Sequence, residues 1–129
     1  MIRRLLSRFR AWQGLAAWGG FDFSRLTVSL TRCSDPKKGE STGYCDGSRL
    51  HVTIGRDPAD ARATLLHEMA HAAAFAHGHD YGHGTAWRAY YEAAASEVFG
   101  LRRVHPFPAE LKAEELTAEV ARRFRRRLK

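Results

Sequence analysis

The strongest constraint on the fold is a helical segment that is apolar on nearly every side. Asp57 and Pro58 predict its start, because aspartate accepts hydrogen bonds from free backbone amides and proline fits the first helical position. Gly78 is placed to end it. In between, the apolar residues are nearly continuous: Leu65, Leu66, Met69, Ala70, Ala73, Ala74 and Phe75. Such a helix is shielded from water only in the middle of a domain, so we expect the rest of the chain to cover it.

Three polar residues interrupt this helix in the pattern H-E-x-x-H: His67, Glu68 and His71. Histidines four residues apart lie on one helix face, so both imidazoles can reach one Zn²⁺ at about 2.0–2.1 Å. Burying these groups without a metal would be costly. The pattern predicts a zinc ion that activates a water molecule. Glu68 takes the proton of that water as general base, and the hydroxide attacks a peptide carbonyl.

A third ligand is expected from downstream, leaving a fourth position open for catalysis. His83 is favoured, because Gly82 and Gly84 beside it let the backbone approach a metal. Glu92 or Glu97 of the next predicted helix is the alternative, as in gluzincins, and Glu92 is the better placed of the two.

Two other histidines, His77 and His79, follow the motif less convincingly. His77 stands six residues after His71, which is metzincin spacing, but Ala74 occupies the position where that pattern has glycine. The only methionines, Met1 and Met69, provide no Met-turn downstream. We therefore expect His77 at the helix end and His79 on the loop surface or beside the ligands.

The remaining segments predict an α+β fold. Residues 26–30 and 50–54 alternate apolar and polar side chains, which indicates two half-buried strands in a small antiparallel sheet. Residues 34–47 are rich in turn formers and predict a loop or long hairpin. Helices are expected over residues 1–18, from Thr85 to a stop at Gly100, and from about Ala109. With 129 residues, one domain is expected, built as a small sheet against the central helix with flanking helices.

Basic residues gather at both ends of the chain, which carries a formal net charge of +7. They are Arg3, Arg4, Arg8 and Arg10 near the start, and Arg122, Arg123, Arg125, Arg126, Arg127 and Lys129 near the end. Such clusters favour DNA or other phosphate backbones, although solvated helix faces or helices on anionic lipid would look the same. The arginine-rich start superficially matches a transit peptide, but a first helix packed on the core is simpler.

No segment is long and apolar enough to cross a membrane, so we expect a soluble protein. We also expect it to be cytoplasmic and monomeric. Cys33 and Cys45 lack zinc-ribbon spacing. A disulfide across the glycine-rich loop between them is geometrically conceivable, but free thiols are expected in a reducing cytosol.

The segment from Leu65 to Ala72, followed by Gly82-His83-Gly84-x-x-Trp87, resembles the core of the SprT-like zinc metalloproteases, the family that includes Spartan. The resemblance spans roughly Leu26 to Phe99. It implies a zincin-like fold, with residues 1–105 as the metallopeptidase domain and the basic helix at 106–129 as its extension. It also implies zinc on His67, His71 and His83, Glu68 as the base, and proteolysis of DNA-associated proteins. The Cys-based zinc ribbon of many bacterial relatives is not recognisable here.

Two functions therefore compete. The first is a peptidase that binds an extended protein or peptide substrate as an added strand beside residues 50–54. The second is a non-catalytic nucleic-acid-binding module that keeps a zincin scaffold for structure. The intact Glu68 favours the first, because a retained base has no obvious structural role.

Overall fold

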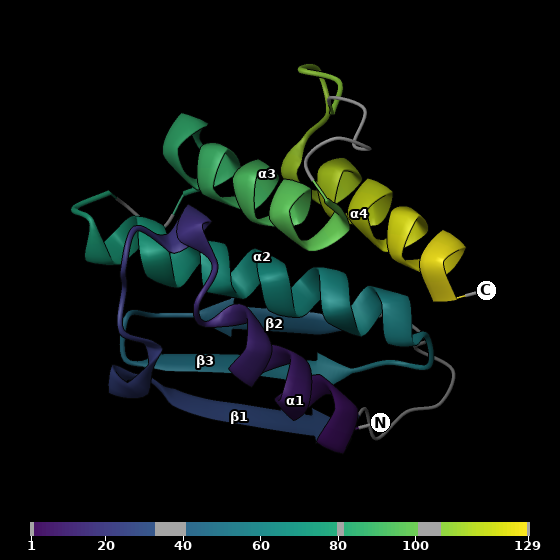
Figure 1. Cartoon of the computed structure of the whole chain (residues 1–129), viewed down its shortest axis with the longest axis horizontal. Helices are drawn as coiled ribbons and strands as arrows, with labels where there is room; N and C mark the ends of the chain where they lie inside the picture. Colours follow the sequence, from purple (N-terminus) through teal and green to yellow (C-terminus); the bar gives the residue numbers. More distant parts are fainter. Residues whose placement is uncertain (1, 33–40, 80–81, 101–106, 129) are drawn as a thin grey trace.

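The computed structural model describes residues 2–32, 41–79, 82–100 and 107–128, apart from the side chains of residues 127 and 128. It is an α+β fold, as predicted, with a three-stranded sheet and four α-helices in these residues (Figure 1). The elements in chain order are α1 (Ile2–Trp12), the short 3-10 helices η1 (Ala16–Trp18) and η2 (Phe23–Arg25), β1 (Thr27–Arg32), β2 (Thr42–Cys45), β3 (Arg49–Ile54), α2 (Pro58–Ala76), α3 (Thr85–Phe99) and α4 (Ala113–Leu128).

The sheet has the strand order β1-β3-β2 and is mixed. β3 pairs in parallel with β1 and antiparallel with β2. The prediction of an antiparallel sheet was therefore wrong for the β1–β3 pair. The physical reason is β2, which lies within the segment expected to be a loop or hairpin. A tight turn at Asp46 and Gly47 reverses β2 into β3, which then enters the middle of the sheet alongside β1.

The central position of β3 also overturns the predicted substrate-binding edge. Both edges of β3 are already paired, so no substrate strand can add beside residues 50–54. Among the described strands, the free edges belong to β1 and β2.

Helix α2 lies in the middle of the molecule, between the sheet and the helices α3 and α4 (Figure 1). Its start is as predicted, because the Asp57 carboxylate accepts a hydrogen bond from the Ala59 amide at 2.9 Å and Pro58 opens the helix. It ends at Ala76, and Gly78 follows with a φ of 89°. The nearly continuous apolar sequence is explained by this burial on several sides.

Two helix boundaries differ from the expected ones, each for a visible reason. α1 ends at Trp12, and η1 forms separately because the Glu97 carboxylate accepts hydrogen bonds from the amides of Ala16 and Ala17. α4 begins at Ala113 because the guanidinium of Arg88 binds carbonyl oxygens in the preceding turn, those of Pro108, Ala109 and Leu111.

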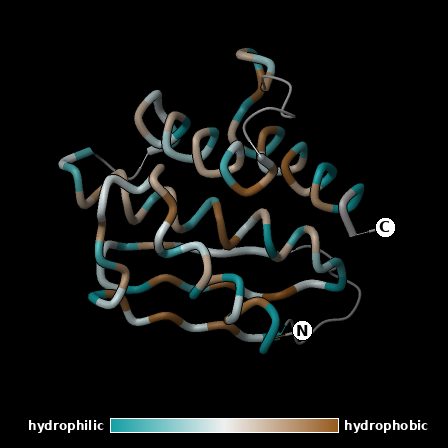
Figure 2. The backbone as a smooth tube through the Cα atoms, viewed as in Figure 1, coloured by the Kyte–Doolittle hydropathy of each residue, from teal (hydrophilic) through white to brown (hydrophobic). Residues whose placement is uncertain are grey.

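The helices α1 and α4 are amphipathic and complete the core. α1 packs against β1 and α2 through Leu5, Phe9 and Trp12. Apolar and polar residues alternate along α4 (Figure 2), and its apolar side is buried. None of the helices in the described residues is long and apolar enough to span a membrane.

Candidate metal centre

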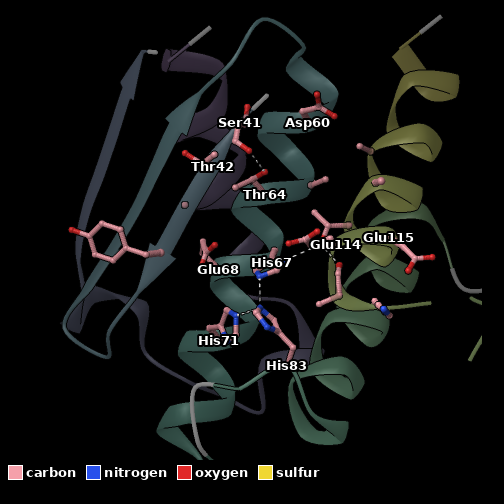
Figure 3. Close-up of a pocket in the computed structure, with 18 of the residues that line it drawn as sticks. Ser41, Thr42, Asp60, Thr64, His67, Glu68, His71, His83, Glu114 and Glu115 are labelled. Atoms are coloured by element: carbon pink, nitrogen blue, oxygen red, sulfur yellow. Dashed lines mark hydrogen bonds between the residues drawn. The ribbon is translucent and has the colours of Figure 1, made fainter. Parts of the chain in front are cut away.

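Three histidine side chains converge above α2, as Figure 3 shows. His67 and His71 lie one turn apart on that helix, and His83 stands just before Gly84, the residue that precedes the first turn of α3. The Nε2 atom of His83 lies 3.1 Å from Nε2 of His67 and 3.0 Å from Nε2 of His71. Two segments separated by a loop thus bring three ring nitrogens to one point.

These distances fit a shared cation. In a tetrahedral zinc site with bonds of about 2.0–2.1 Å, neighbouring ligand atoms are about 3.3 Å apart. Hydrogen bonds alone do not explain the cluster, because Nε2 of a neutral imidazole has either one hydrogen or one lone pair. The Nε2 atom of His83 therefore cannot form a hydrogen bond with both neighbouring nitrogens. A metal ion between the three nitrogens could bind the lone pairs of all of them.

The protonation of the two α2 histidines suits metal binding. Burial lowers the pKa of His67 to about 3, with further contributions from His71 and His83. Burial and the nearby His83 lower the pKa of His71 to about 4. Both imidazoles are therefore neutral near pH 7, the form that donates a lone pair to a metal.

The indole ring of Trp87 in α3 packs against all three imidazoles. Its ring centroid lies 4.7 Å from that of His67 and 4.8 Å from that of His83. Its indole N–H donates to the backbone carbonyl of His67 at 3.2 Å. Tyr91, one turn later, stacks on Trp87 and donates its hydroxyl to the Ala63 carbonyl. The imidazoles thus rest on two packed aromatic rings.

Glu68 lies next to the histidines on the side of β2 (Figure 3) and is only 4% exposed. Burial raises the pKa of its carboxyl to about 8. The strand approaches so closely that a Cβ atom at Gly43 would lie 2.9 Å from Cγ of Glu68 and 2.7 Å from the His51 carbonyl oxygen. Glycine at this position is what allows β2 to cover the carboxyl.

Sequence reasoning missed this role of Gly43, which was grouped with turn residues. The available signal is that a glycine within a strand marks a close approach of the backbone. Sequence reasoning also missed Thr117 of α4, whose hydroxyl lies 2.8 Å from Nδ1 of His67. No local pattern marks that residue.

An open cleft of 1110 Å³ contains the three histidines and Glu68. One wall is β2 with the preceding Ser41, the floor is α2, and the other wall is α4 with the preceding Lys112. His83 is exposed, so the nitrogen cluster can be reached from solvent. The arrangement can hold a metal and present it to a molecule lying in the cleft.

The other candidate ligands lie elsewhere. His77 ends α2, where Nε2 bonds the Trp18 carbonyl at 3.0 Å. His79 is exposed and contacts the ring of Tyr90. Glu92 forms an ion pair with Arg88, while Glu97 binds the amides of η1. Among the described residues, the structure brings together His67, His71 and His83 alone as a possible metal-binding group.

Cys45 lies in β2 as a free, half-buried thiol, and burial raises its pKa. Cys33, the other cysteine, lies outside the described residues.

Comparison with known proteins gives a family match over most of these elements. The model of the SprT-like family matches residues 20–111, which include the sheet, α2, His83 and α3 and leave α1 and α4 outside. Comparisons with curated proteins and with solved structures give no significant match. Since the matched segment is well over half of the sequence, the chain belongs to the SprT-like family.

Proposed function

We propose that the protein is a zinc-dependent metallopeptidase with a zincin-like active site. The observation that carries the proposal is the convergence of three imidazole nitrogens beside a buried carboxyl in an open cleft. His67, His71 and His83 would hold the zinc. A zinc ion bound there supplies a Lewis acid that polarises a peptide carbonyl and acidifies a water molecule.

Glu68 is assigned the proton transfers. Its carboxylate accepts a proton from the attacking water and passes it to the nitrogen of the leaving amine. Positive charge beside the carboxyl favours its ionised form, which opposes the effect of burial on its pKa. The cover provided by β2 and Gly43 keeps this carboxyl next to the ligands and away from bulk water.

The substrate is proposed to be an extended segment of protein lying along β2. This strand is at the sheet edge and lines the cleft, so it offers backbone hydrogen-bonding groups to an added strand. This replaces the predicted edge at residues 50–54 with one that is free among the described strands.

The experiment is a cleavage assay of zinc-loaded protein on an unfolded protein substrate, comparing wild type with Glu68→Gln. We expect the variant to retain zinc and to lose about 10²–10⁴-fold in rate, because the ligands remain and the proton acceptor is removed. An unchanged rate in Glu68→Gln would refute the mechanism.

A second candidate, the nucleic-acid-binding module, is favoured by a basic cluster on α1 and α2. Burial and the neighbouring charges of Arg8 and Arg4 lower the pKa of Arg62. Two arginines of α1 therefore lie near this arginine of α2. The basic end of α4 is partly neutralised within the protein, since Arg123 pairs with Glu119 and Arg125 with Asp57 and Asp60.

Peptidase activity and DNA binding can also combine in one protein, with DNA recruiting protein substrates to the active site. The cleavage assay is therefore run with and without DNA, alongside salt-dependent DNA binding of wild type and an Arg4→Gln, Arg8→Gln variant. DNA binding that falls with salt and with this variant, in a protein that cleaves no substrate, would favour the non-catalytic module.

A further inference from the structure

The hydroxyl of Thr117 occupies a specific place beside the candidate ligand His67. Nδ1 of His67 lies 2.8 Å from Oγ1 of Thr117, and the same hydroxyl donates to the carbonyl oxygen of Ala113 at 2.9 Å. The hydroxyl of the nearby Tyr91 donates to the Ala63 carbonyl at 2.9 Å. It therefore has no hydrogen left to give to Thr117.

These contacts determine the direction of the bond to His67. The single hydroxyl hydrogen of Thr117 is directed to the Ala113 carbonyl, which cannot donate in return. In this arrangement Thr117 accepts from His67, which places the hydrogen of the imidazole on Nδ1. Nε2 is left with its lone pair, and it is Nε2 that faces His83 at 3.1 Å.

We propose that Thr117 is a positioning residue of the metal centre, which fixes the tautomer and ring orientation of His67 so that Nε2 is ready for zinc. The inference rests on the proposed zinc site and extends it to α4, a helix outside the matched residues 20–111.

Packing holds Thr117 in place independently of His67. The neighbouring Leu116 and Val120 are fully buried in the core. Further along α4, Phe124 stacks on Trp12 with centroids 5.8 Å apart, and it also packs against Phe99 at 4.7 Å. The helix therefore brings a preplaced acceptor to the imidazole, which is what a positioning partner of a metal ligand requires.

His71 provides a contrast within the same cluster. Its Nδ1 atom is buried and has no hydrogen-bond partner among the described residues. Of the two α2 histidines, His67 is therefore the one whose tautomer is set by a described side chain, that of Thr117. Removing that side chain's hydroxyl should affect zinc binding without touching a ligand.

The test compares wild type, Thr117→Val and the matched control Thr117→Ser. Valine keeps the shape of threonine without the hydroxyl, while serine keeps the hydroxyl. Zinc affinity is measured by competition with a chelator. We expect Thr117→Val to bind zinc about 10–100-fold more weakly and Thr117→Ser to remain near wild type. Equal affinity in wild type and Thr117→Val, or equal weakening in both variants, would overturn the inference.

A second readout separates positioning from simple loss of folding. Nitrogen-15 NMR of the metal-free protein reports the His67 tautomer directly, and we expect hydrogen on Nδ1 in wild type and Thr117→Ser. In Thr117→Val, a larger fraction of the molecules should carry the hydrogen of the His67 ring on Nε2. An unchanged tautomer would contradict the role assigned to the hydroxyl. Wild type that binds no zinc would overturn the proposed function together with this inference. Wild-type zinc binding with no effect of Thr117→Val would overturn the inference alone.

Discussion

The buried carboxyl of Glu68 gives a prediction that does not depend on enzymatic activity. The pKa of this carboxyl is raised to about 8 in the folded, metal-free protein, from an ordinary value of 4.5. Between these values the folded state binds more protons than the unfolded state, so the free energy of unfolding falls as pH rises. Glu68→Gln removes this titration and keeps the size of the side chain.

The magnitude follows from the two pKa values. Each pKa unit corresponds to about 1.4 kcal/mol, so wild type should lose about 2–3 kcal/mol relative to Glu68→Gln between about pH 5.5 and 7.5. The other titrating groups are shared by both proteins, and their effects cancel in the difference. Above about pH 8 the folded carboxyl ionises as well, and the difference should level off.

The assay is urea unfolding of both proteins in the presence of a chelator, followed by tryptophan fluorescence, because Trp18 and Trp87 are buried. A stability difference that stays constant across this pH range would refute the reasoning. It would mean that the Glu68 carboxyl is hydrated in the folded protein and that β2 does not shield it.

Two further substitutions test the surroundings of the site. Gly43→Ala places a Cβ atom 2.7 Å from the His51 carbonyl oxygen and 2.9 Å from Cγ of Glu68, so we expect a loss of about 1–3 kcal/mol in urea unfolding and slower peptide cleavage with unchanged zinc content. Normal stability and cleavage would show that β2 shifts freely. His77→Ala removes the bond to the Trp18 carbonyl and should cost about 1 kcal/mol while zinc is kept, whereas zinc loss would identify His77 as a ligand.

Much of α2 and its motif could be predicted because the signals are local. Asp57 and Pro58 specify the start of the helix through its first amides, and Gly78 adopts the positive φ that follows its end. The spacing of His67 and His71 places both on one face whatever surrounds the helix. The glycines beside His83 favoured it as the third ligand, and the structure brings its ring nitrogen close to those of the other two histidines.

The sheet was less predictable because strand pairing depends on distant segments. β2 is only four residues long and lies within a segment rich in turn formers, so alternation could not mark it. Without β2, the two longer strands looked like neighbours in an antiparallel pair. The parallel pairing of β1 with β3 and the cover over Glu68 both follow from that missed strand.

The contribution of α4 to the site depends on how one helix lies across another. Its amphipathic pattern indicated a packed helix, but the pattern does not say which residue faces His67. Thr117 takes that position because Leu116 and Val120 enter the core and orient the helix over α2. This contact is determined by tertiary packing and has no local signal in the sequence.

The central claim, a three-histidine zinc site, is tested most directly by the zinc content of purified wild type and His83→Ala, measured by elemental analysis. The account predicts one zinc per chain in wild type and its loss in His83→Ala, because two remaining imidazoles are too few for a stable site. Wild type without zinc, even after reconstitution, or full zinc retention in His83→Ala, would contradict it.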